Sequence, residues 1–161
     1  MLNHRTLARR IAAGIVLGSG VLAATNAYAG SCPPDQVLTE PREIERAPDV
    51  GIGRETVATV DLTGWRDMGH FMLRTRRLTI APDAIVPTHA HDDRPSIVYI
   101  LNGELIEHST FCAVPIVHRA GEASAESGEG HAHWWENQSG ETVIVLSSDV
   151  VPFEEMDDPH M

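Results

Sequence analysis

The sequence contains no lysine, so its positive charge comes from 12 arginines, set against 23 acidic residues for a formal net charge of −11. A protein that binds nucleic acid needs a basic surface to neutralise phosphates, and this balance argues against such a partner. Anionic membrane surfaces are disfavoured for the same reason. Aromatic residues are scarce at 5%, but hydrophobic residues reach 42% of the 161 positions, enough for the core of one domain.

Long apolar runs are also scarce, and the one that occurs is at the N-terminus. Residues 1–29 carry three arginines and no acid, then an apolar run at 11–24, and end in Ala27-Tyr28-Ala29. A basic start, a short apolar stretch and a small-x-small end are typical of a secretory signal peptide. The run is too short and glycine-rich for a comfortable membrane span, although an uncleaved anchor is the alternative. We therefore expect a periplasmic or secreted protein.

Cysteine is rare as well, with only Cys32 and Cys112 in the chain. Both follow the expected cleavage site and would enter an oxidising compartment, where disulfides persist. One interpretation is a disulfide that ties the N-terminal arm to the domain, which could stabilise the fold by roughly 4 kcal/mol through loop closure. The other is two unrelated thiols, because sequence does not show whether the geometry allows a bridge.

The rest of the chain is typical of an all-β domain. Residues 30–54 contain four prolines and little apolar periodicity, which predicts an extended arm. A barrel is expected over 55–151 and an acidic tail over 152–161. Short runs rich in β-branched residues predict strands at 55–62, 71–80, 96–101, 104–110, 114–118 and 141–151. Asn102-Gly103, between two of these runs, favours a tight hairpin.

Histidine placement suggests the chemistry. His89 and His91 form one His-x-His pair, and His131 and His133 form a second. Residues i and i+2 of a strand point to the same face, so each pair would aim two imidazoles in one direction. Neutral imidazole is a common ligand for zinc, iron, copper and nickel. Two pairs on separate strands therefore predict a metal site inside the barrel.

These motifs resemble those of the cupins. The first cupin motif places a glutamate after His-x-His and a glycine six residues later; here the order is His89, His91, Ser96 and Gly103. The second has a glycine, a histidine and an asparagine, and residues 130–137 follow it. The resemblance covers about residues 73–150 and implies a small jelly-roll β-barrel. It also implies a metal on His89, His91 and His133, and a structural turn residue at Asn137.

The departure from the family is Ser96, which stands where the cupins supply their glutamate ligand. A serine hydroxyl is a poor ligand for a divalent ion. The site could be a neutral three-histidine centre with open positions, which we favour, with His131 as a candidate fourth ligand. Other groups could fill the gap, namely Asp92, Asp93 or Glu129. Alternatively the metal site is degenerate and the pocket binds something else.

The resemblance implies functions of different classes. Three-histidine cupin sites resemble those of iron-dependent dioxygenases, so we favour an oxidoreductase that acts on a small polar or anionic molecule, with iron preferred to manganese, copper, nickel or zinc. A non-catalytic periplasmic binding protein is the alternative, as is a metal-dependent isomerase or lyase. Candidate pocket residues are Arg94, Ser96, Tyr99 and Trp135. A homodimer is a further expectation by analogy with the family.

Overall fold

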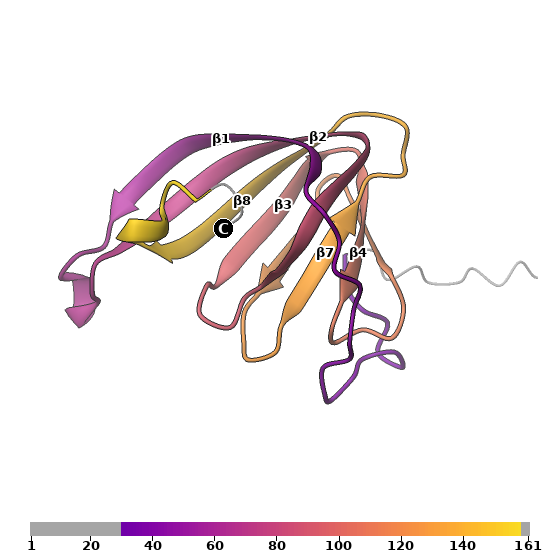
Figure 1. Cartoon of the computed structure of the whole chain (residues 1–161), viewed down its shortest axis with the longest axis horizontal. Coiled ribbons are helices and arrows are strands. Elements are labelled where there is room, and N and C mark those ends of the chain that lie inside the picture. The colour runs from indigo at the N-terminus through magenta and orange to yellow at the C-terminus, as the bar shows by residue number, and fades with distance from the viewer. Residues whose placement is uncertain (1–29, 159–161) are drawn as a thin grey trace, which may run out of the picture.

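The computed structural model (Figure 1) describes residues 30–158, and the expected signal peptide lies outside the described residues. Two short 3₁₀ helices, η1 (Trp65–Asp67) and η2 (Phe153–Glu155), flank the strands. The strands are β1 (Val50–Asp61), β2 (Phe71–Ala90), β3 (Ser96–Asn102), β4 (Glu104–Ser109), β5 (Ile116–Arg119), β6 (Ala123–Glu126), β7 (Ala132–Glu136) and β8 (Val143–Pro152). Within this part of the chain, no helix has the length and apolar character needed to cross a membrane.

The strands form one antiparallel sheet that curls into a nearly closed barrel (Figure 1). Their order is β5-β4-β7-β2-β8-β3-β6, and β1 pairs with β2 outside this path. The two end strands, β5 and β6, are consecutive in the chain and are joined by a turn at residues 120–122. This short connection brings the two ends of the sheet together, so the predicted all-β jelly-roll barrel is confirmed.

Strand β2 organises the barrel, because it pairs with β1, β7 and β8. It is 20 residues long, whereas the sequence predicts a strand that stops at residue 80. The continuation contains Pro87, which lies in a register shift between β2 and β7, where a missing N–H is tolerated. Strand β1 likewise begins at Val50, within the range expected as arm.

The predicted hairpin at Asn102-Gly103 is wrong. Strand β3 pairs with β6 and β8, whereas β4 pairs with β5 and β7, so the turn carries the chain across the barrel. Gly103 has a φ of 87°, and a Cβ at this position would lie 2.7 Å from Val143 Cγ2. The turn signal in the sequence is real, but the neighbours of each strand are set by the global topology.

The core fills the barrel from the inward faces of the strands. Along β3, Ser96, Val98 and Ile100 are buried, while Ile97 and Tyr99 are exposed, which is the alternation expected of a strand. The buried cluster contains Leu78, Ile80, Ala84, Val98, Ile100, Leu105, Trp135, Val143 and Val145. The apolar end of the barrel therefore adjoins the polar residues described below.

Asn137 holds the turn that follows β7, the structural role implied by the resemblance. Its amide nitrogen donates to the carbonyl oxygens of Ile80, Ala81 and Glu141, at 2.6–3.1 Å. Its side-chain oxygen accepts from the backbone N–H of Ser139 at 3.1 Å. A fully buried amide with this many partners fixes the end of β7 relative to β2.

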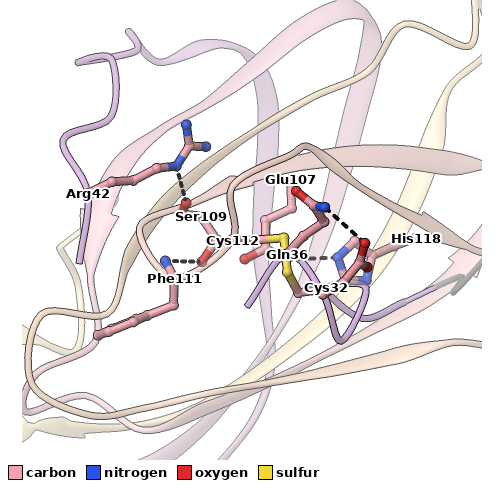
Figure 2. The surroundings of a disulfide bond; sticks show 9 residues. Cys32, Gln36, Arg42, Glu107, Ser109, Phe111, Cys112 and His118 are labelled. Atoms are coloured by element: carbon pink, nitrogen blue, oxygen red, sulfur yellow. Dashed lines mark hydrogen bonds and ion pairs between the residues drawn. A yellow bond between two sulfur atoms is a disulfide. The ribbon is translucent and has the colours of Figure 1, made fainter. Parts of the chain in front are cut away.

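The N-terminal arm lies along the segment that follows β4. A disulfide joins Cys32 to Cys112 (Figure 2). Val37 forms an isolated β-bridge with Cys112, and the backbone N–H of Leu38 donates to the carbonyl of Phe111 at 2.9 Å. The arm therefore packs against the barrel and is covalently attached to it.

A buried ion cluster joins β2 to β8 and to the loop that precedes β3. Asp149 accepts hydrogen bonds from Arg74 at 2.7 and 3.0 Å, and from Arg76 and Arg94 at 3.2 Å each. Asp149 is 1% exposed. Burial alone would raise the pKa of Asp149, but the hydrogen bonds from Arg74 and the charge of Arg76 outweigh it and hold that pKa below its usual value.

We predict that Asp149→Asn lowers the free energy of unfolding by about 3–5 kcal/mol, because it leaves three buried guanidinium groups without this carboxylate. A depressed carboxyl pKa contributes stability above its unfolded value of 3.8, and this is lost as the pH falls through the folded value. Urea denaturation should therefore show a large difference between variant and wild type at neutral pH and a smaller one below pH 3.8. The exposed Asp93→Asn serves as control, and an equal loss there would contradict the prediction.

Candidate metal centre

The pairing of β2 with β7 brings the histidine motifs together. His89 and His133 are direct cross-strand partners in the antiparallel ladder, so their side chains project on the same face. His91 follows the end of β2, and its backbone N–H donates to the carbonyl of His131 at 2.7 Å. The ladder thus continues past the strand end, and three imidazoles from two strands meet at one point.

The three imidazoles converge through their Nε2 atoms. His133 Nε2 lies 3.1 Å from His89 Nε2 and 3.0 Å from His91 Nε2. The ligand atoms of His89, His91 and His133 all lie within 4.8 Å of one another. His91 and His133 are buried, and His89 is partly buried at the edge of the site.

Each imidazole is held in orientation at its other nitrogen. The Nδ1 atoms lie 2.8–2.9 Å from oxygen atoms, namely the Pro87 carbonyl for His89, the Arg94 carbonyl for His91 and the Glu107 carboxylate for His133. Because these oxygens accept, each Nδ1 carries the proton, and in the neutral ring the lone pair lies on Nε2. Three lone pairs therefore point at the same small volume.

This donor set fits a divalent transition metal. Two nitrogens bound to one ion at about 2.1 Å each are at most about 4.2 Å apart, and the separations of 3.0 and 3.1 Å satisfy this limit. A hydrogen-bonded arrangement without an ion fits less well, because one proton on His133 Nε2 could be donated to only one of the two neighbouring Nε2 atoms, those of His89 and His91. Imidazole nitrogens held by hydrogen bonds at Nδ1 are the usual ligands of zinc, iron, copper and nickel.

Electrostatics keep two of the imidazoles neutral. Burial lowers the pKa of His89 well below its usual value and lowers that of His91 to about 3. His133 differs, because the charge of Glu126 and the hydrogen bond that its Nδ1–H donates to Glu107 outweigh its burial and raise its pKa. A metal would therefore compete with a proton mainly at His133.

Glu107 links the site to a second buried histidine. One carboxylate oxygen lies 2.8 Å from His133 Nδ1 and the other 2.8 Å from His118 Nε2. Burial opposes the charge of Glu107, but the hydrogen bonds from both histidines outweigh it and lower its pKa. Figure 2 shows Glu107 and His118 among the residues that surround the disulfide between Cys32 and Cys112. Sequence reasoning did not single out Glu107.

The structure does not bring His131 into the three-histidine group. It belongs instead to a second group, formed with Glu107 and His133, and the two groups share His133. His131 precedes β7, so the strand alternation assumed from the sequence does not apply to it. Asp92, Asp93 and Glu129, the other proposed substitutes for the family's glutamate, are all exposed.

Glu126, which sequence reasoning missed, is the carboxylate that does reach the site. It is 2% exposed, and its Oε2 lies 3.3 Å from His91 Nε2 and 3.8 Å from His133 Nε2. Ser96 donates a hydrogen bond to the same oxygen at 2.5 Å. Burial raises the pKa of Glu126. In the sequence, Glu126 ends the short segment Ala-Ser-Ala-Glu, whose small residues do not show the apolar alternation that would predict a strand.

The histidines form one end of a small cavity of about 50 Å³. A water needs roughly 10–15 Å³ on this measure, so the space suits a few waters or a small molecule. Arg94 and Trp135 line the cavity, as predicted from the sequence, whereas the 41%-exposed Tyr99 does not, because it lies on the outward face of β3. The lining also includes Arg54, Arg76, Leu78, Ile80, Val86, Val98, Leu105, Glu126, Val145 and Ser147.

Arg94 is buried at 3% exposure and only partly paired. Its Nη1 donates to Asp149, but its Nε and Nη2 are buried without a hydrogen-bond partner within residues 30–158. Buried donors of a charged group are rarely left unpaired, because each costs free energy. Arg94, which lines the cavity, therefore has two N–H donor groups, Nε and Nη2, that are not used in hydrogen bonds among the described residues.

No protein family profile and no curated protein matches the chain. Solved structures are similar. KdgF from Halomonas sp. is 15% identical, with a TM-score of 0.49, covering 65% of this chain and 83% of its own. The cupin_2 domain of an XRE family transcriptional regulator from Enterobacter cloacae is 15% identical, with a TM-score of 0.47 and coverages of 63% and 98%. A predicted oxalate decarboxylase from Thermotoga maritima is 20% identical, with a TM-score of 0.44 and coverages of 62% and 93%.

At these identities the likeness concerns the fold alone. The chain is a nearly closed antiparallel β-barrel that carries three convergent histidines inside. Cupin domains are among the similar solved structures, and the nearly closed barrel is consistent with a small cupin domain.

We predict that Glu107→Gln weakens metal binding about 10- to 100-fold, because it removes the negative charge that supports His133 while keeping the side-chain shape. Isothermal titration with Co²⁺ or Zn²⁺ measures the dissociation constant. Glu136→Gln is the matched control, because Glu136 is not part of the three-histidine group. Its carboxylate lies 2.9 Å from His108 Nε2 instead. Equal affinities for the Glu107 variant and wild type would contradict the role assigned to Glu107.

Proposed function

We propose that this protein is an exported metalloenzyme that binds one divalent transition metal, preferably iron, through His89, His91 and His133. Its reaction is an oxidation of a small anionic molecule by molecular oxygen, of the dioxygenase kind, in which both oxygen atoms enter the product. The observation that carries the proposal is the convergence of three Nε2 atoms, each ring held by a hydrogen bond at Nδ1, beside a small cavity.

The cavity supports a small substrate with a negative charge. Its limited volume excludes large molecules, and its walls combine aliphatic side chains with three arginines. The buried Nε and Nη2 of Arg94 are donors that a carboxylate could accept in a forked contact. Arg94 would therefore fix the orientation of the substrate relative to the histidines.

A bound ion would supply Lewis acidity and, if it is redox-active, electron transfer between substrate and oxygen. The chain's own residues would do the rest. His89, His91 and His133 hold the ion, and Glu107 keeps the His133 ring oriented and basic. The aliphatic walls and Trp135 exclude bulk water, which strengthens the attraction between Arg94 and an anion.

The primary test combines metal analysis with oxygen consumption. Protein purified from its exported compartment should contain close to one iron, copper or manganese per chain. A panel of small carboxylic acids, with the matching alcohols as uncharged controls, should include an acid that triggers oxygen uptake. Zinc or nickel without oxygen uptake would instead identify a binding protein or a Lewis-acid enzyme, and absence of metal would contradict the proposal.

The variant His91→Ala should lose stoichiometric metal binding while the barrel stays folded, because the apolar core is built from other residues inside the barrel and does not need the ion. Metal content by mass spectrometry and thermal unfolding by circular dichroism measure the two effects. His70→Ala, outside the site, is the control. Full metal occupancy in the His91 variant would show that the ligand assignment is wrong.

Export is proposed from the N-terminal pattern and is supported by the disulfide between Cys32 and Cys112, since such bonds persist in oxidising compartments. Cleavage after Ala29 would leave nine arginines against 23 acidic residues. The mature protein should therefore begin at Gly30 and appear in the periplasmic or extracellular fraction. N-terminal sequencing checks this, and retention of Met1 in a cytoplasmic fraction would contradict it.

A further inference from the structure

The residue that stands at the family's glutamate position faces a glutamate on the neighbouring strand. Ser96 begins β3 and Glu126 ends β6, and the two are direct cross-strand partners in the antiparallel ladder. Side chains of such partners lie on the same face of the sheet, about 4.5–5.5 Å apart at Cβ. A carboxylate on β6 can therefore reach the volume that a carboxylate on β3 would otherwise occupy.

Glu126 is placed as a ligand would be. Its Oε2 is 3.3 Å from His91 Nε2 and 3.8 Å from His133 Nε2, both below the limit of about 4.2 Å for atoms that share one ion. Its Oε1 is buried and has no hydrogen-bond partner among the described residues. A buried carboxylate with one unpartnered oxygen, whose other oxygen lies close to the Nε2 atoms of His91 and His133, favours a cation at this position.

Ser96 has a definite part in this arrangement. Its hydroxyl donates to Glu126 Oε2 at 2.5 Å, so it fixes the carboxylate against the histidines. A serine is small enough to leave room for the glutamate that crosses from β6. The serine thus does not mark a lost ligand; it accompanies a ligand supplied from the adjacent strand.

We propose that Glu126 is the fourth protein ligand of the metal and that Ser96 positions its carboxylate. This inference rests on the metal site proposed above. It changes the expected charge, because one carboxylate with three neutral imidazoles leaves a net charge of +1 at a divalent ion. It also explains why the exposed Asp92, Asp93 and Glu129 are not needed to complete the site.

The test is a four-member exchange between the two positions. Co²⁺ affinity and visible absorption are measured for wild type, Glu126→Ser, Ser96→Glu and the double exchange Ser96→Glu/Glu126→Ser. Loss of Glu126 should weaken binding by at least about 100-fold, more than loss of an outer hydrogen-bond partner. The double exchange returns a carboxylate to the site from β3 and should recover most of the affinity and the intensity of the Co²⁺ bands.

Ser96→Glu alone should gain nothing, because it places a second carboxylate directly opposite the buried Glu126. Glu126→Gln is the nearly isosteric variant, and Glu129→Gln is the matched control at an exposed glutamate near the site. Circular dichroism and thermal unfolding establish that each variant is folded. If Glu126→Ser fails to fold, Glu126→Gln takes its place in the comparison, because it preserves the side-chain volume.

The outcomes separate this inference from the proposed function. If wild type binds one Co²⁺ and the folded Glu126 variants bind it equally well, Glu126 is not a ligand although the three-histidine site stands. If affinity falls with Glu126 and returns with the double exchange, the inference holds. If wild type binds no Co²⁺, the proposed metal function fails, and Glu126 with Ser96 then forms only a buried hydrogen-bonded pair.

Discussion

The antiparallel register between β2 and β7 is the constraint on which the site depends. It places His89 opposite His133, and the same ladder, continued through the His91 backbone, adds the third imidazole. A shift of one residue would turn each side chain to the other face of the sheet. The register is fixed by the buried core at one end of β2 and by the hydrogen bonds of Asn137 at the end of β7.

The buried charged groups of the barrel are paired with partners of opposite charge or with hydrogen-bonding groups. Asp149 is surrounded by three arginines, and Glu107 lies between His118 and His133. Buried ions are tolerated when each finds partners of opposite charge or several hydrogen bonds. Against this background, the unpartnered atoms of Arg94 and Glu126 are exceptions, and both line the cavity. Their position favours an anion near Arg94 and a cation near Glu126.

A ligand can move between neighbouring strands without changing the fold. In a sheet, two residues that face each other across a ladder reach nearly the same volume, so the backbone does not need to change when a carboxylate shifts from one to the other. Ser96 and Glu126 are such a pair. A motif read along one strand therefore misses a ligand that the adjacent strand supplies.

The sequence alone determined the all-β fold and the histidines that converge, because strand periodicity and His-x-His spacing are local properties of the chain. It did not determine that Asn102-Gly103 connects strands with different partners, that Tyr99 faces outward, or that His131 lies outside the histidine group. It also left the strand at Ala123–Glu126 unrecognised, since four residues with little apolar periodicity carry too weak a signal. Only the tertiary structure decided that Glu126 lies opposite Ser96, because strand pairing between distant segments is set by closure of the whole barrel.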